Sequence, residues 1–144
     1  MGATTVAIEK LPAGTEVGSA IEALERYAGV KGAAIMAAEI GGGNTLMPIV
    51  AAAERGLPLI DADTTRRAFP QIQMTLLSAA GISAAPMALA DPKGNMVVCD
   101  TIDNHSTEAV IRAAVSAMGH VAGAAGYLVR TQQVIDHAVL GSVT

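Results

Sequence analysis

Apolar residues recur every three to four positions between residues 16 and 27, which is the spacing of one buried helix face. Acidic and basic residues occupy the opposite face. Thr15 precedes the segment as a candidate N-cap, and Gly29 follows it as a stop. The pattern predicts an amphipathic helix over 16–27 that packs one face on a sheet.

Two continuous apolar runs, 32–38 and 57–61, lack this period and are bounded by Gly, Pro or acidic residues. Such runs are typical of parallel strands that are buried on both faces. Residues 45–55 between them predict a helix, for which Asn44 is a candidate N-cap. With a short β-prone run at 4–8, the order is strand, helix, strand, helix, strand. That order is typical of a parallel α/β sheet.

The second half of the chain carries mixed signals. Residues 71–80 favour a short helix, although a strand also fits them. The apolar runs 87–90 and 96–99 flank a turn-forming cluster and predict a β-hairpin. Ser106 or Thr107 is a candidate N-cap for a following helix. The predicted fold is therefore α/β, with a mainly parallel sheet built from βαβ units, a C-terminal β-hairpin and helices.

Length and composition add two expectations. A chain of 144 residues has the size of one domain, so we expect a single unit over residues 1–144. Hydrophobic residues make up 51% of the chain, but two Tyr, one Phe and no Trp leave a core of small and aliphatic side chains. Only 15% of residues are charged and the mean hydropathy is +0.44. Apolar surface is then left for a partner, either another copy in a homo-oligomer or a further domain.

The charge and the sequence pattern also argue against several kinds of partner and location. A net charge of −4 with scattered basic residues argues against a nucleic-acid partner. Every long apolar run is interrupted before the roughly 20 residues that a membrane span needs, so we expect no membrane partner. The N-terminus does not resemble a signal peptide, and Cys99 is a lone cysteine. We therefore expect a cytoplasmic protein, with Cys99 as a buried apolar residue.

Polar residues follow both predicted parallel strands, whose carboxyl ends line the ligand crevice in such sheets. Glu39 precedes the glycine turn 41–44. This turn either presents N–H groups to an anion or, as we favour, is an ordinary turn that caps a helix. Asp61 and Asp63 are two residues apart, so an extended segment places them on one side, where they can share a cation or a proton. Equally, Asp61 ends a strand and Asp63 caps the next turn.

Two other groups carry less chemistry. The run 103–105 holds an acid, an amide and an imidazole before a helix, and a capping network is the favoured interpretation over a ligand or base. His120 and His137 lack metal-ligand spacing, and no complete zinc motif occurs. Arg66 and Arg67 are candidate partners for a carboxylate of the protein or of a substrate.

One dense segment resembles a known family. It runs Leu57-Pro58-Leu59-Ile60-Asp61-Ala62-Asp63, then Arg67-Ala68-Phe69-Pro70 and Gln73-Met74. These residues resemble the central signature of the S-methyl thiohydantoin desulfurase family, whose members often carry hydantoinase-like labels. Weaker matches extend the likeness over nearly the whole chain, although Thr64-Thr65-Arg66 stands where the family usually has Gly-Met-Gly. The resemblance implies an N-terminal-domain fragment of a longer protein with a further β-rich domain.

The resemblance implies a metal-assisted hydrolase that acts on a small cyclic amide or thioamide, such as a thiohydantoin or hydantoin. It implies a divalent metal, zinc or manganese, with Asp61 and Asp63 as candidate ligands. The implied catalytic residues are Asp61, Asp63 and Glu39. The implied substrate-binding residues are Asn44, Arg67, Gln73, Gly42 and Gly43. No nucleotide motif is present.

A rival hypothesis needs no catalysis. An α/β domain can bind a small anion or oligomerise while its acidic residues serve as caps. A fragment of an enzyme can likewise fold and remain inactive in isolation. Metal dependence separates these hypotheses, because an ion that binds only the folded state must raise the melting temperature.

Overall fold

The computed structural model describes residues 13–144, and the strand predicted at 4–8 lies outside this range. The helices are α2 (Glu16–Ala28), α3 (Gly43–Arg55), α4 (Leu76–Ala79), α5 (Asn104–Ala117) and α6 (Thr131–His137). The strands are β1 (Ile35–Met36), β2 (Leu59–Ile60), β3 (Ala62–Asp63), β4 (Met87–Ala90), β5 (Met96–Cys99), β6 (Gly123–Ala125) and β7 (Val139–Leu140).

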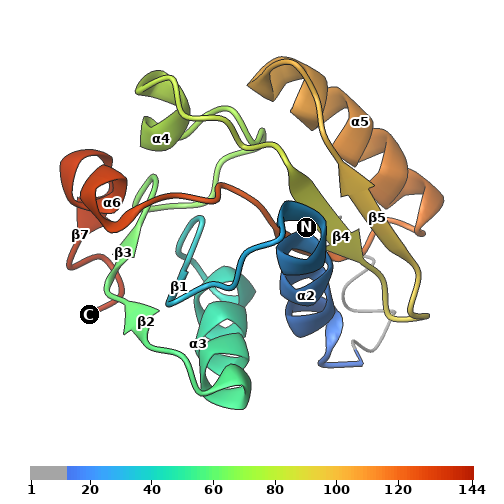
Figure 1. The fold of residues 1–144 in the computed structure, drawn as a ribbon, viewed down its shortest axis with the longest axis horizontal. Coiled ribbons are helices and arrows are strands. Elements are labelled where there is room, and N and C mark those ends of the chain that lie inside the picture. Colours follow the sequence, from blue (N-terminus) through green and yellow to red (C-terminus); the bar gives the residue numbers. More distant parts are fainter. Residues whose placement is uncertain (1–12) are drawn as a thin grey trace.

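A three-stranded antiparallel sheet in the order β5-β4-β6 forms the centre of one half of the molecule. Helix α2 covers one face of this sheet and α5 covers the other (Figure 1). Side chains alternate along the middle strand β4. Met87 and Leu89 pack in a cluster with Ile111 of α5, whereas Ala88 and Ala90 pack against α2. All four residues of β4 are therefore buried.

Small residues let α2 approach the sheet closely. Ala20 and Ala23 of the helix are buried against the alanines of β4. A Cβ atom added to Gly123 of β6 would lie 2.5 Å from the carbonyl carbon of Glu16, which is too close for any side chain. The core of small and aliphatic side chains that the composition predicts is therefore closely packed between α2 and the sheet.

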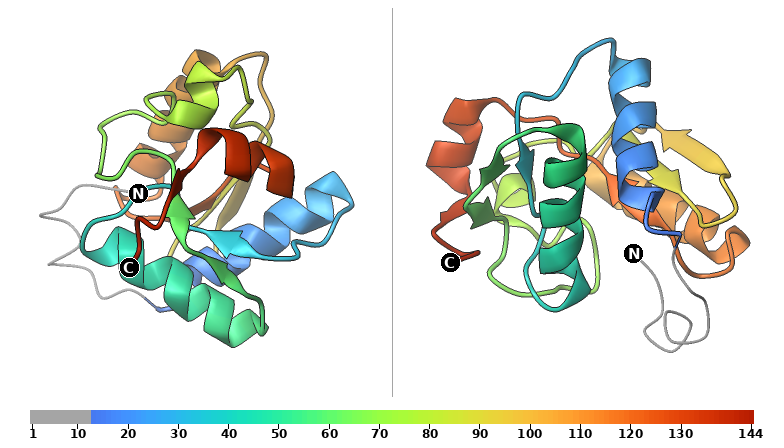
Figure 2. Two further views of the ribbon diagram at one scale, coloured as in Figure 1. Left: turned by 90° about the vertical axis from the view of Figure 1, so that its left-hand side faces the viewer. Right: turned by 90° about the horizontal axis from the view of Figure 1, so that it is seen from below.

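The other half of the molecule contains a βαβ unit. Strands β1 and β2 pair in parallel, with Ile35 opposite Leu59, and α3 connects them. Strand β3 pairs antiparallel with β7 near the C-terminus. Helix α3 lies beside α2 (Figure 2), and an ion pair of 2.5 Å between Arg55 Nη2 and Glu25 Oε2 joins them.

The prediction of a mainly parallel sheet is wrong. Within residues 13–144 the sheets have two or three strands, and only β1 and β2 pair in parallel. A continuous apolar run indicates burial on both faces, but it does not reveal the direction of the neighbouring strand. The strand that is buried on both faces is β4, which is antiparallel to its two neighbours. The third strand of that sheet, β6, comes from a glycine- and alanine-rich segment without a strand pattern.

Several local predictions are confirmed. Helix α2 matches the predicted helix over 16–27 and ends at Gly29, whose left-handed backbone (φ 68°) lets its N–H donate to Glu25 O. The hairpin of β4 and β5 has the predicted strands. Cys99 is buried in the cluster between β4 and α5. Apart from these predictions, no helix within residues 13–144 is long and apolar enough to cross a membrane.

Other local predictions place the ends of helices wrongly. The N-cap of α5 is Asp103, whose Oδ1 accepts the Ser106 N–H at 2.7 Å, and not Ser106 or Thr107. Asn44 lies inside α3, and Gly42 holds the N-cap position. The helix predicted over 71–80 shrinks to α4, because side-chain contacts hold the residues before it in an irregular path.

Candidate functional site

The segments that follow β1 and β2 lie side by side. The Thr64 N–H donates to Ala38 O at 3.1 Å, and the Ile40 N–H donates to Asp63 Oδ2 at 3.1 Å. Parallel pairing of β1 and β2 brings the two segments to one edge, as the carboxyl ends of parallel strands require. Glu39, Asn44, Asp63 and the residues up to Phe69 are thereby gathered in one region.

Asp63 lies beneath the surface of this region and binds its backbone. Its carboxylate is fully buried. Besides the Ile40 N–H, it accepts the Arg66 N–H at 2.8 Å on Oδ2 and at 3.0 Å on Oδ1. Arg66 has a left-handed backbone (φ 64°), a conformation that non-glycine residues seldom adopt without support. The carboxylate therefore stabilises a tight turn and ties it to the segment after β1.

Glu39 connects the same two segments on the exposed side. Its Oε1 accepts Asn44 Nδ2 at 2.7 Å, and its Oε2 accepts the Phe69 N–H at 2.8 Å. A carboxylate only accepts hydrogen bonds, so Asn44 must present its amino group to Glu39. The Oδ1 of the exposed Asn44 remains as an acceptor at the surface.

A cation and an aromatic ring complete this surface. The guanidinium carbon of Arg67 lies 5.3 Å from the centre of the Phe69 ring, within the range of a cation–π contact. Within residues 13–144 neither Arg66 nor Arg67 forms an ion pair with a carboxylate. The Arg67 guanidinium is thus exposed, positively charged and held next to an apolar face.

The glycine turn bends sharply into α3. Gly42 has φ 51° and ψ −123° and holds the N-cap position without a side-chain cap. The Gly41 N–H donates to Thr45 Oγ1 at 2.9 Å, and the Asn44 N–H donates to Gly41 O at 3.1 Å. The exposed residues Gly42 and Gly43 place the positive end of the α3 dipole beside Glu39 and Asn44.

Asp61 has a different environment from Asp63. It is exposed and accepts the Thr144 hydroxyl at 2.7 Å on Oδ2 and the Val143 N–H at 2.9 Å on Oδ1. The Thr144 hydroxyl and then the Val143 N–H lower the pKa of the Asp61 carboxyl. The Gly141 N–H also donates to Asp61 O at 2.8 Å. Asp61 therefore holds the residues after β7 against the end of β2.

The hydrogen-bond partners of Asp61 and Asp63 determine whether these residues can form the predicted metal site. In the described range no three His, Cys, Asp or Glu side chains form a group that could hold an ion. Asp61 and Asp63 do not share a partner, and both oxygens of Asp63 already accept backbone N–H groups. The residues present do not fit a complete metal centre, so we derive no chemical step through zinc or manganese. Metal binding stays a prediction.

The contacts that hold residues 70–73 were not predicted from the sequence. Glu108 Oε2 accepts the Ile72 N–H at 2.8 Å, and Arg112 Nη2 donates to Pro70 O at 2.8 Å. Tyr127 Oη donates to Ile72 O at 2.9 Å. The sequence does contain an acidic and a basic residue four positions apart on α5, Glu108 and Arg112. This spacing is typical of an ion pair on one helix face, but it does not show that the two side chains also bind the backbone of residues 70–72.

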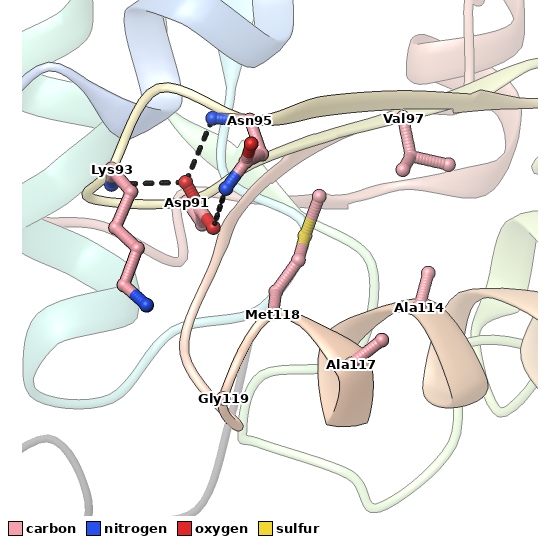
Figure 3. A pocket seen from close by; sticks show the side chains of 8 residues that line it. All are labelled: Asp91, Lys93, Asn95, Val97, Ala114, Ala117, Met118 and Gly119. Carbon is pink, nitrogen blue, oxygen red and sulfur yellow. Dashed lines mark hydrogen bonds between the residues drawn. The ribbon is translucent and has the colours of Figure 1, made fainter.

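A cleft of about 320 Å³ lies elsewhere, between the turn of the β4–β5 hairpin and the end of α5 (Figure 3). Its floor is apolar, with Val97 and Met118 among the lining residues. Asp91 at its rim accepts the N–H groups of Lys93 and Asn95, which fixes the turn. None of the predicted site residues lines this cleft.

The fold and these loops define a mixed α/β domain with a polar surface assembled from two chain segments. A family model described as the S-Me-THD-like N-terminal domain matches residues 1–101. The chain belongs to this family, which confirms the family predicted from the sequence and makes the chain a thiohydantoin-related domain.

A solved structure agrees with this fold. An X-ray crystal structure of a protein from Chromobacterium violaceum has a TM-score of 0.85 and 26% sequence identity to this chain. The match covers 99% of this chain and 41% of that one, so the chain spans less than half the length of that protein. No curated protein matches the chain.

Proposed function

We propose that this chain is the ring-binding domain of a hydrolase that acts on five-membered cyclic amides or thioamides of the thiohydantoin or hydantoin type. Its family supports the substrate class. In such a hydrolysis the oxygen of water replaces sulfur at the C=S carbon of a thiohydantoin, which yields a hydantoin and hydrogen sulfide. The ring binds at the surface formed by the turn 41–44 and residues 67–69.

The observation that carries the proposal is the bridge made by Glu39 between Asn44 and Phe69. It brings an amide acceptor, Asn44 Oδ1, to the same surface as the Arg67 guanidinium, which only donates. A cyclic amide presents an N–H beside a C=O or C=S group. An acceptor and a cationic donor in a common region are complementary to that edge, and the Phe69 ring suits the flat face of the heterocycle.

We assign different roles to the three acidic residues. Glu39 is partly exposed and adjoins Asn44, so it is the candidate general base for the attacking water. Asp63 is buried and positions the two segments. Asp61 is exposed and holds residues 141–144 through hydrogen bonds, so we assign it a positioning role there and no role in the chemistry.

Binding by the chain itself tests the proposal. We expect hydantoin and 2-thiohydantoin to shift the backbone amide signals of residues 40–45 and 66–69 in an NMR titration. The control ligand is 1,3-dimethylhydantoin, which keeps the ring but lacks both N–H donors and should bind more weakly. Asn44→Ala should weaken binding about three- to tenfold, the effect of one hydrogen bond. Equal binding of hydantoin and the dimethyl compound would contradict the proposed recognition.

A non-catalytic association domain is the second candidate function, and α3 favours it. The helix exposes Leu46 (62%), Ile49 (40%) and Val50 (42%) at spacings of three and four residues, which forms an apolar stripe. If the chain functions by association through this stripe, Leu46→Glu should reduce its mass in sedimentation experiments. If the chain is a monomer and binds hydantoin, the association function is contradicted and the ring-binding function is supported.

A further inference from the structure

Strand β5 forms one edge of the three-stranded sheet. The order β5-β4-β6 gives β5 a single neighbour, and within residues 13–144 no strand pairs with its outer side (Figure 1). An edge strand presents unpaired N–H and C=O groups along which another extended chain can pair. Lysine and proline commonly prevent such pairing, and β5 contains neither. A further strand can therefore add to the sheet along β5.

The register of the hairpin shows which backbone groups of β5 face outward. The Asp91 N–H donates to Asn95 O at 3.0 Å, so these residues form a hydrogen-bonded pair. Hydrogen-bonded and non-hydrogen-bonded pairs alternate along an antiparallel ladder. Val97 therefore bonds to β4, whereas the N–H and C=O groups of Met96 and Val98 point away from it. These outward groups are the donors and acceptors available at the edge.

The same two residues also expose apolar side chains. Met96 is 48% exposed and Val98 is 36% exposed, on the face of the sheet that α2 covers only in part. Ile102 follows β5 by three residues and is 94% exposed. Large apolar side chains next to an unpaired strand edge suit a protein partner, because its side chains remove them from water.

Charges at the two ends of β5 favour a second copy of this chain as that partner. Lys93 precedes β5 and Asp100 follows it, and both side chains are exposed. Within residues 13–144 neither forms an ion pair. Antiparallel pairing of two identical strands brings the start of one beside the end of the other, so Lys93 meets the opposite charge of Asp100. Parallel pairing would instead bring like charges together.

We propose that two copies of this chain pair antiparallel through their β5 strands and join their central sheets into one. A twofold axis at Val97 sets Met96 of each copy opposite Val98 of the other, and each such pair exchanges two backbone hydrogen bonds. In this register Ile102 reaches the β4–β5 turn of the second copy. The paired segment is short, so the dimer dissociates on dilution. This inference does not depend on ring binding.

Sedimentation and NMR of the whole chain test the pairing. We expect the mass to rise from monomer to dimer between about 10 and about 500 µM, the range for a small interface. Over the same range the amides of Met96 and Val98 should become protected from exchange. A mixture of isotope-labelled and unlabelled chains should show contacts between these two residues across the copies. A monomer throughout, or a dimer without this protection, overturns the proposal.

A proline substitution tests the outward N–H group. Val98→Pro removes a donor that faces away from β4, a position at which edge strands tolerate proline. We expect it to raise the dissociation constant of the dimer at least about tenfold, with the fold checked by circular dichroism. Leu46→Glu on the exposed stripe of α3 is the control and should leave the dimer intact. A dimer that Leu46→Glu dissociates and a folded Val98→Pro retains would refute pairing through β5.

Charge reversal tests the orientation without changing the strand. Lys93→Glu and Asp100→Lys each create two like-charge contacts in the dimer, and each should weaken it about three- to tenfold. Mixing the two variants restores both opposite-charge contacts and should restore the wild-type dissociation constant. If either variant alone dimerises like the wild type, or if the mixture stays as weak as its components, antiparallel pairing is overturned.

Discussion

Asp61 and Asp63, which are separated by a single residue, show that the surroundings of a side chain decide its role. Asp63 is fully buried and supports the backbone of Ile40 and Arg66, whereas Asp61 is exposed and holds the residues after β7. The spacing alone suits a shared cation or proton equally well. Their hydrogen-bond partners distinguish the two side chains. Apart from Arg66, which follows Asp63 by three residues, those partners are distant in the sequence.

Removing the Asp63 carboxylate should destabilise the fold. Asp63→Ala leaves two N–H donors without their buried acceptor, so we expect the free energy of unfolding to fall by about 2–3 kcal/mol. Urea denaturation followed by circular dichroism measures this change. Asp136→Ala on the exposed face of α6 is the control and should change stability by less than about 0.5 kcal/mol. If Asp63→Ala lowers the free energy of unfolding by no more than this control does, the structural role of Asp63 is refuted.

Asp61 should make the C-terminal contacts sensitive to acid. Bonds from the Thr144 hydroxyl and the Val143 N–H lower its pKa in the folded state. Its contribution is therefore present above the pKa of an unfolded Asp and is lost as the pH falls through the lower, folded value. The protection factor of the Val143 amide, which compares its exchange with that of an unfolded peptide at the same pH, should fall over that acidic range. Asp61→Asn should remove this pH dependence, and an unchanged profile in the variant would contradict the assignment.

Packing at the level of elements depends on two different kinds of glycine. Gly123 of β6 lies against the first turn of α2, whereas Gly18 lies inside α2 with open space around its Cβ position. Both look alike in the sequence. Contact between α2 and β6 distinguishes them, and no local pattern predicted that β6 exists.

Substitutions at these glycines should have opposite signs. Gly123→Ala forces α2 away from the sheet, and we expect a loss of about 1–3 kcal/mol. Gly18→Ala removes backbone freedom from the unfolded chain at an unstrained helical position and should stabilise by about 0.5–1 kcal/mol. Thermal and urea unfolding of the two variants measure the difference. Two effects of the same sign would argue against the close α2–β6 contact.

At the scale of the whole molecule, Glu25 connects the two halves. Its carboxylate is buried at the end of α2 and pairs with Arg55 of α3 and with Lys31. Burial alone would raise the pKa of Glu25, but bonds from the Gly32 N–H, Lys31 and Arg55 outweigh it and lower the pKa. The pair therefore favours the arrangement in which the βαβ unit packs beside the central sheet.

Breaking this pair should loosen the contact between the halves. Arg55→Met keeps the length of the side chain but leaves Glu25 with Lys31, whose side chain is 81% exposed. We expect a loss of about 2 kcal/mol, below the full cost of an isolated buried charge because Lys31 remains. Hydrogen exchange should rise in α3 more than in β4. Arg26→Met on the exposed side of α2 is the control, and an equal effect there would refute a specific role for Arg55.

The sequence by itself determined the elements whose signals are local. The period of α2, its stop at Gly29, the β4–β5 hairpin, the β1-α3-β2 unit and the family all follow from residues close together in the chain. The tertiary structure decided the direction of the main sheet, the strand β6, and which acids are buried. These depend on contacts between distant segments, such as Glu39 with Phe69 and Ile72 with Glu108, and no short pattern encodes such contacts.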